Sequence, residues 1–279
     1  MNTCVDVAGS LPAGLVDMYR LVEASATDLD IPFLVVGAMA RDLVLHHGFG
    51  ANIERGTRDV DFAIQVDSWA SFTLLRETLI KSGMKEDERL IYRLGFEASD
   101  GLPWELDILP FGAITDDAQD LSWPPEGDIK MSMLGFPEAL ASAWLVNIHS
   151  EEECVISVAN PVAMVILKMV AWTERDPQLR RKDASDVAYI IKSYEKIPEV
   201  FERLYDEEQG LAAACDYDLE EASAMLIGTQ ISEMAAEQTK NYLCSELLDV
   251  EKHRLAFIHD MDDDRAETWV DRLSVALQR

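Results

Sequence analysis

Cysteine is scarce in this sequence, and its few cysteines do not suggest a covalent framework. Cys4, Cys154, Cys215 and Cys244 are scattered over 279 residues, and no C-x-x-C pair is present. Disulfide scaffolds and structural zinc sites both need closely or regularly spaced cysteines. We therefore expect reduced thiols, as in a cytosolic protein.

Long apolar runs are also absent. The most apolar stretch, residues 162–167, is interrupted by Lys168, whereas a membrane-spanning helix needs about 20 consecutive apolar residues. The N-terminal sequence MNTCVD lacks the basic start and apolar centre of an export signal. A cytoplasmic protein without membrane contact is the expectation.

Basic residues are outnumbered, since 24 Lys and Arg face 52 Asp and Glu, which gives a formal net charge of −28. Because nucleic-acid affinity is built mainly on phosphate neutralisation, this charge argues against a broad nucleic-acid-binding face. One exception is a basic island at residues 168–182, where Lys and Arg outnumber Glu174 and Asp176. The basic island is either a solvated helix face or a place where a small anionic ligand binds.

The chain is long and apolar enough for a real core. Apolar residues make up 48% of it, which suits one large domain or two modest ones. Strand and helix patterns alternate up to about residue 159, whereas the pattern is helical after the Asn160-Pro161 helix start. We therefore expect an α+β fold, with a mixed β-sheet core and flanking helices over residues 1–159 and a helical part over residues 160–279.

Local periodicity and turn residues predict the individual elements. The expected strands cover residues 33–36, 59–66, 90–97 and 104–109, with a further hairpin over 139–149 and 154–158. The acidic, proline-containing residues 116–128 are expected to form a loop. The expected helices cover residues 15–28, 39–47, 69–81, 162–173, 182–194, 198–205, 219–249 with a break near Gly228, and 263–277.

Two aspartates stand out in the strand predicted at residues 59–66. Asp59 and Asp61 are two residues apart, so they project from the same face of a strand, while Val60, Phe62 and Ile64 share the other face. Two adjacent like charges repel, and they are tolerable in water or around a cation that neutralises both. The pair therefore indicates either a solvated strand end or a metal site.

Two further features lie on either side of this pair in the sequence. Gly37-Ala38 joins a buried strand to a helix, and such a small-residue turn lets a ligand approach the backbone closely. On a later strand, Glu105 and Asp107 again fall on one face. Two separate strands thus each present a pair of carboxylates at alternate positions.

In this order, Gly37-Ala38, Asp59-x-Asp61 and Asp107 resemble the motifs of the nucleotidyltransferase superfamily with a polymerase-β-like core. The stretch Arg55-x-Thr57-x-Asp59-x-Asp61-Phe62, with Val36–Ala40 upstream, is similar to AbiEii-type toxin nucleotidyltransferases of abortive-infection and type IV toxin–antitoxin systems. Those proteins carry a lysine and an aspartate pair on later helices, which Lys168, Asp183 and Asp186 match. The resemblance covers about residues 33–194 and implies a nucleotidyltransferase-like mixed sheet.

The resemblance also implies a chemistry, which is transfer of a nucleoside monophosphate from a nucleoside triphosphate to an acceptor hydroxyl with two metal ions. Asp59 and Asp61 would ligate both Mg²⁺ ions, with Mn²⁺ as an alternative. Asp107 would ligate the ion that activates the hydroxyl and would help to remove its proton. The implied nucleotide-binding residues are Gly37, Ala38, Thr57, Arg58, Lys168, Asp183 and Asp186. Many members have serine in place of Ala38, and the basic island would compensate for the lost hydroxyl.

Structural alternatives exist for these residues, because Lys168 can be a snorkelling side chain, Asp183 and Asp186 a capping or solvated pair, and Arg58 part of a strand-edge salt bridge. Two alternative functions also stay open. An antibiotic-modifying nucleotidyltransferase would suit the acidic chain if its acceptor is cationic, and a non-catalytic module would keep the fold alone. The acceptor could be tRNA, protein or a small molecule, and the toxin resemblance implies an antitoxin partner.

Overall fold

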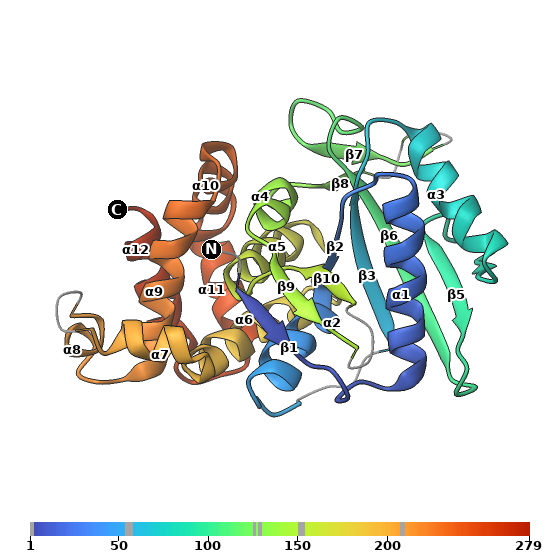
Figure 1. The fold of residues 1–279 in the computed structure, drawn as a ribbon. Coiled ribbons are helices and arrows are strands. Elements are labelled where there is room, and N and C mark those ends of the chain that lie inside the picture. The colour runs from blue at the N-terminus through green and yellow to red at the C-terminus, as the bar shows by residue number, and fades with distance from the viewer. Residues whose placement is uncertain (1–2, 54–57, 125–126, 128–129, 150–153, 207–209) are drawn as a thin grey trace. The chain divides into compact units, whose positions relative to one another are not determined.

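The computed structural model describes residues 3–53, 58–124, 127, 130–149, 154–206 and 210–279. The chain divides into two compact units (Figure 1). The first consists of Met1–Gly48 and Asn52–Asn160, and the second of Phe49–Ala51 and Pro161–Arg279. The first unit holds a mixed β-sheet with flanking helices and the second is helical, which confirms the expected α+β class.

The sheet of the first unit has the strand order β1-β9-β10-β2-β3-β6-β5-β4. Parallel pairs (β1 with β9, β10 with β2, β3 with β6) are mixed with antiparallel ones. The strands are β1 (Cys4–Asp6), β2 (Phe33–Val36), β3 (Asp59–Gln65), β4 (Lys85–Glu86), β5 (Arg93–Glu97), β6 (Pro103–Phe111), β9 (Trp144–Asn147) and β10 (Val155–Val158).

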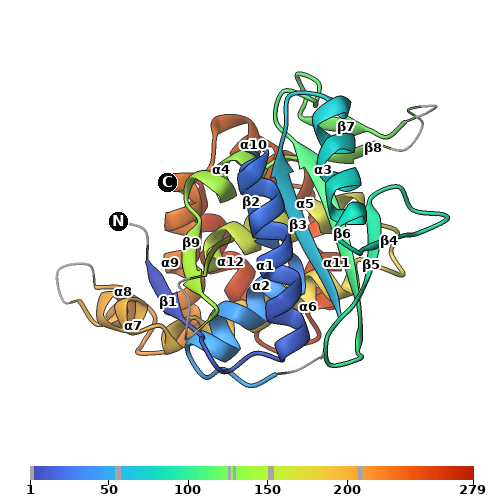
Figure 2. The same cartoon turned by 45° about the vertical axis from the view of Figure 1, so that its right-hand side comes forward.

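The central strand β3 has one apolar and one polar face, as its alternation predicts. Val60, Phe62 and Ile64 are fully buried. The helix α1 (Ala13–Asp28) runs along this apolar face (Figure 2), where the Tyr19 and Phe62 rings lie 5.7 Å apart. The apolar face of β3 therefore anchors the sheet, and the aspartates are left on the opposite side.

Hydrogen bonds to side chains fix the first turns of two helices that pack together in this unit. The turn between β5 and β6 holds the start of α1, because the Gly14 amide donates to Asp100 at 3.2 Å. The helix α3 (Trp69–Lys81) begins where predicted, with the Ser68 hydroxyl accepting from the Ser71 amide. Between them, β2 continues into the helical segment α2 (Gly37–Arg41) and η1 (Asp42–Gly48).

The first unit departs from the expected pattern in several places. The short strands β1 and β4 were not expected. Residues 116–128, expected to form a loop, contain β7 (Asp120–Ser122), which pairs with β8 (Lys130–Ser132) in a small separate sheet. The expected hairpin strand over 139–149 is shorter, because α4 (Phe136–Ala141) occupies its first part. Leu121 and Trp123 are buried, so this acidic segment contributes two apolar side chains to the core.

The second unit is built from helices throughout its described residues. They are α5 (Pro161–Glu174), α6 (Arg181–Ser193), η2 (Tyr194–Lys196), α7 (Pro198–Leu204), α8 (Leu211–Ala214), α9 (Leu219–Met234), α10 (Glu237–Tyr242), η3 (Leu243–Leu248), α11 (Glu251–Met261) and α12 (Ala266–Leu277). In the described part of the chain, no helix combines the length and apolar character needed to cross a membrane.

The helix break expected near Gly228 lies further along the chain. The helix α9 runs through Gly228 and ends at Met234, before the extended residues Ala235 and Ala236. A Cβ atom on Gly228 would lie 2.3 Å from the carbonyl oxygen of Leu273 in α12. The glycine therefore does not interrupt the helix but lets the α9 and α12 backbones approach each other closely.

Candidate functional site

The aspartates identified in the sequence lie on two adjacent, parallel strands. Asp59 pairs with Glu105 and Asp61 pairs with Asp107 in the register of β3 and β6. Asp59 is exposed and Asp61 half-buried, while the Asp107 side chain is only 11% exposed. Paired residues on neighbouring strands project from the same face, so Asp61 and Asp107 lie side by side on the polar face.

Gly37 makes room for Asp61 at the end of β2. Asp61 pairs with Val36, the last residue of that strand. Gly37 has a φ of +73°, and a Cβ atom built on it would lie 2.1 Å from Oδ2 of Asp61. The glycine thus satisfies a left-handed backbone and a close side-chain approach at once. Ala38 follows as the second residue of α2.

Asp107 is held by an arginine that sequence reasoning did not select. Arg93 lies opposite Asp107 on β5. Its Nε and Nη2 donate to the two Asp107 carboxylate oxygens at 2.7 and 2.8 Å, and Nη1 donates to Glu105 at 2.6 Å. These hydrogen bonds and charges raise the pKa of the Arg93 guanidinium above its ordinary value, so it remains charged. The alternation of Arg93, Gly95 and Glu97 with Leu94 is the signal that would have placed Arg93 on the polar face.

The carboxylates have the right chemistry for a hard divalent cation, although they are not gathered into a ready-made site. Among the described residues, no group of three His, Cys, Asp or Glu side chains is placed to hold a metal ion. Asp61 and Asp107 offer oxygen ligands from paired positions, as Mg²⁺ and Mn²⁺ prefer. The Arg93 fork already engages both Asp107 oxygens. The donor types therefore fit, and Arg93 is the group with which a cation would share Asp107.

Two further candidate residues, Thr57 and Arg58, precede β3 in the sequence. Thr57 lies outside the described residues. Arg58 is exposed just before β3, and its carbonyl accepts a hydrogen bond from the Glu105 amide at 3.1 Å. The Arg58 backbone thus extends the pairing of β3 with β6.

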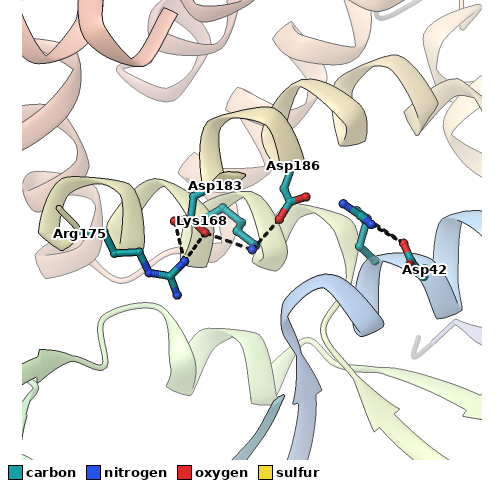
Figure 3. A network of polar contacts seen from close by, with 6 residues as sticks. Asp42, Lys168, Arg175, Asp183 and Asp186 are labelled. Atoms are coloured by element: carbon teal, nitrogen blue, oxygen red, sulfur yellow. Dashed lines mark hydrogen bonds and ion pairs between the residues drawn. The ribbon is translucent and has the colours of Figure 1, made fainter. Parts of the chain in front are cut away.

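The later candidates form an ion-pair network within the second unit (Figure 3). Lys168 of α5 lies 3.2 Å from Asp183 and 2.6 Å from Asp186, both on α6. Nη1 of Arg175 donates to both Asp183 oxygens at 2.9 and 2.7 Å. The Asp183 side chain is fully buried and that of Lys168 is 13% exposed, whereas that of Arg175 is 39% exposed. The structure therefore brings Lys168, Asp183 and Asp186 together and adds Arg175.

The basic island is largely neutralised by carboxylates of its own unit. Beyond Lys168 and Arg175, Arg180 pairs with Asp260 at 3.0 Å and Arg181 with Asp262 at 2.6 Å. Arg180 also lies over the Trp172 ring, 4.1 Å from its centroid. These cations thus tie helices of this unit together, whether or not the basic island also binds an anion.

A buried ion pair in the first unit was also not anticipated. Arg41, at the end of α2, donates through Nε and Nη2 to the Asp42 carboxylate at 2.8 and 2.7 Å. Asp42 is labelled in Figure 3. Both residues are buried. Adjacent residues of opposite charge give no periodic signal in a sequence, so only the burial marks this pair as unusual.

Comparison with known proteins adds a family match. A family model described as "Nucleotidyl transferase AbiEii toxin, Type IV TA system" matches residues 20–272. No curated protein matches the chain.

Several solved structures resemble the chain distantly. The antibiotic-resistance factor ANT(2'')-Ia is 16% identical, with 73% of this chain and 95% of that chain covered and a TM-score of 0.36. The lincomycin-bound lincosamide antibiotic adenylyltransferase LnuA is 13% identical, with 68% and 98% covered and a TM-score of 0.38. The Thermotoga maritima CCA-adding enzyme complexed with tRNA is 12% identical, with 98% and 85% covered and a TM-score of 0.28. Likenesses as distant as these indicate nothing about activity.

Proposed function

Because the chain belongs to the AbiEii family of nucleotidyltransferase toxins of type IV toxin–antitoxin systems, we propose that it transfers a nucleoside monophosphate from a nucleoside triphosphate to an acceptor hydroxyl. Family membership supports nucleotidyl transfer in general. The observation that carries the site assignment is the register of β3 and β6, which pairs Asp61 with Asp107 beside Gly37.

The proposed roles follow from the chemistry of each side chain. Mg²⁺ or Mn²⁺ bound by Asp59, Asp61 and Asp107 would supply charge neutralisation at the triphosphate and activation of the acceptor hydroxyl. Asp107 accepts the proton of that hydroxyl, and Gly37 and Ala38 let phosphate approach the backbone. Thr57 and Arg58 complete the nucleotide contacts proposed for this unit.

In the helical unit, we propose that Lys168 neutralises part of the negative charge of the triphosphate. Its ammonium group lies between two carboxylates, at 3.2 Å from Asp183 and 2.6 Å from Asp186. A lysine held between two carboxylates in this way is fixed in position by its ion pairs. Asp183 and Asp186 are therefore proposed to orient Lys168.

The family also suggests a biological role. We propose that nucleotidyl transfer by this protein is toxic to its host cell and is restrained by an antitoxin, as the family description implies. The acceptor is tRNA, protein or a small molecule. The net charge of −28 favours a second candidate activity, the modification of a cationic small molecule such as an antibiotic, because a cation is attracted to an acidic surface. Transfer from labelled triphosphates to each acceptor class separates these activities.

The first prediction concerns the aspartate pair. Asp59→Asn and Asp61→Asn should each lower the rate of nucleotidyl transfer by about 10²-fold or more, since loss of a metal ligand removes several kcal/mol of transition-state stabilisation. The measurement is transfer of label from each α-labelled nucleoside triphosphate, with circular dichroism to verify folding. Asp67→Asn, an isosteric change in an exposed residue just after β3, should leave transfer unchanged. Full activity in either site variant would refute the assignment.

A binding measurement tests the same assignment without an acceptor. A nucleotide at about a hundred times its dissociation constant stabilises the folded protein by roughly 2.7 kcal/mol. We expect a Mg²⁺-dependent thermal shift with at least one nucleoside triphosphate, absent in Asp61→Asn and present in Asp67→Asn. The absence of any shift in the wild-type protein would favour a non-catalytic module.

A further inference from the structure

The ion pair between Arg93 and Asp107 is bidentate. Two parallel N–H···O bonds of 2.7 and 2.8 Å join the guanidinium to the two oxygens of one carboxylate. Such bidentate pairs fix orientation as well as charge. A third bond, from Nη1 to Glu105 at 2.6 Å, ties the same guanidinium to the neighbouring carboxylate on β6. Arg93 is therefore attached at three points.

This pair is unlike a surface ion pair in the same sheet. Lys85 on β4 and Glu97 on β5 also make a close contact, at 2.8 Å, but their side chains are 72% and 70% exposed. The Arg93 and Asp107 side chains are 25% and 11% exposed. Exposed pairs are screened by water and contribute little, whereas partly buried ones are screened much less. The charge of Arg93 is therefore felt by the carboxylates beside it.

The position of Arg93 links it to the proposed cation ligands. Val36, Asp61, Asp107 and Arg93 occupy one row across four neighbouring strands, because each pairs with the next. An ionised carboxylate has about four lone-pair sites, of which the fork uses two. Asp107 can thus keep its bonds to Arg93 and still offer lone pairs on its other side. The positive guanidinium at the same time repels any cation that approaches Asp107.

We propose that Arg93 is a positioning residue for nucleotidyl transfer, which fixes the Asp107 carboxylate and weakens the binding of divalent cations by that carboxylate. The inference rests on the proposed function. The bidentate hydrogen bonds of Arg93 orient the Asp107 carboxylate. The positive charge of the guanidinium weakens cation binding by that carboxylate. A weaker site releases its cation together with the product, so the charge favours turnover.

Two substitutions of Arg93 separate the effect of its bidentate hydrogen bonds from the effect of its positive charge. Arg93→Met removes both, and Arg93→Lys keeps the charge but loses the bidentate geometry. Arg93→Met should bind Mn²⁺ roughly tenfold more tightly, as expected when a unit charge a few ångströms from a divalent ion is removed. Arg93→Lys should bind Mn²⁺ about as the wild type does. Both should lower kcat by roughly 10- to 100-fold, as the loss of a group that orients a metal ligand does.

The experiment is a Mn²⁺ titration of the full chain, followed by electron paramagnetic resonance of the free ion, together with kcat for transfer. Lys85→Met is the matched control, because it removes one positive charge from the neighbouring strand β4, and it should change neither quantity. Tighter Mn²⁺ binding with a lower kcat in Arg93→Met, together with unchanged Mn²⁺ binding in Arg93→Lys, would support the inference. Unchanged or weaker Mn²⁺ binding in Arg93→Met would overturn it, as would an unchanged kcat. A wild-type protein that neither binds Mn²⁺ nor transfers nucleotide would instead refute the proposed function.

Discussion

Asp61 can occupy its position because Gly37, which lies beside it in the fold, has no side chain. Gly37 combines a φ of +73° with a position where a Cβ atom would lie 2.1 Å from the Asp61 carboxylate. The sequence singles out the turn at Gly37-Ala38 because it would admit a ligand to the backbone. In the structure, the space above Gly37 is also occupied by the carboxylate of Asp61, so this glycine shapes the site through the protein itself.

The Gly37→Ala substitution should therefore damage stability and activity together. A left-handed backbone costs a non-glycine residue about 1–2 kcal/mol, and displacement of Asp61 adds to this. We expect the free energy of unfolding, measured by urea denaturation, to fall by about 2–3 kcal/mol, with loss of transfer. Gly9→Ala is the control, because Gly9 has a φ of +78° and a Cβ atom added to it would meet no other atom within 4 Å. Equal losses in the two variants would show that contact with Asp61 does not matter.

At the same scale, the sequence revealed the carboxylates but not the groups that hold them. Alternation along one strand is a local pattern, and it placed Asp59 with Asp61 and Glu105 with Asp107. The partner of Asp107 is Arg93, on another strand, and such pairing depends on sheet register.

The ion pairs of the basic island were not predictable from the sequence either, because Arg180 pairs with Asp260, which is distant in the sequence. Charge counted along the sequence is therefore a poor guide to charge left open in the fold.

At the scale of elements, strong periodic patterns and good caps were predictable. The helix predicted at residues 69–81 is α3, with Ser68 as its cap, and the strand predicted at residues 33–36 is β2. The helix α11 was not predicted, because only Phe257 and Met261 of its residues are buried and a mostly exposed helix carries little apolar period. The strands β7 and β8 are too short to give an alternation signal.

Gly228 shows why a glycine within a helical pattern is ambiguous. Its sequence context permitted a break, but tertiary packing uses it for contact between α9 and α12. Alanine normally stabilises a helix by about 1 kcal/mol over glycine, whereas overpacking a core costs about 1–3 kcal/mol. Because the added Cβ would meet the backbone oxygen of Leu273 at 2.3 Å, we expect the steric cost to be the larger.

Gly228→Ala should thus lower the free energy of unfolding by about 1–2 kcal/mol in urea denaturation, despite its better helix propensity. Thr229→Ala is the neighbouring control, since it improves propensity without adding volume at a half-buried position. That variant should be as stable as the wild type or slightly more so. A stabilised Gly228→Ala protein would mean that α9 and α12 separate easily.

At the scale of the whole molecule, the dominant physical property is charge. The net charge of −28 makes the folded chain repel itself. Ion pairs within the helical unit, such as those of Arg180 and Arg181, offset part of this repulsion, but acidic residues remain in large excess. Screening by salt should therefore favour the compact state.

The midpoint of thermal unfolding should rise with ionic strength. An increase from about 0.01 to 0.15 M shortens the screening length from about 30 to 8 Å, which weakens repulsion between distant carboxylates more than attraction within close pairs. Differential scanning calorimetry in NaCl and in KCl would measure the shift, and the two salts should act alike if screening is the cause. A falling midpoint would show that ion pairs outweigh repulsion in this protein.

The parallel pairing of β3 with β6 also affects when the proposed site is assembled during synthesis and folding. Parallel neighbours cannot be joined by a tight turn, so the residues of α3, β4 and β5, which connect β3 to β6, must be synthesised before Asp107 can reach Asp61. Contacts between distant segments form late, because loop closure costs entropy before the contact repays it. A nascent chain therefore exposes Asp59 and Asp61 well before the third carboxylate arrives. On the proposed function, synthesis yields an inert protein first, and its activity begins only when the crossover has closed.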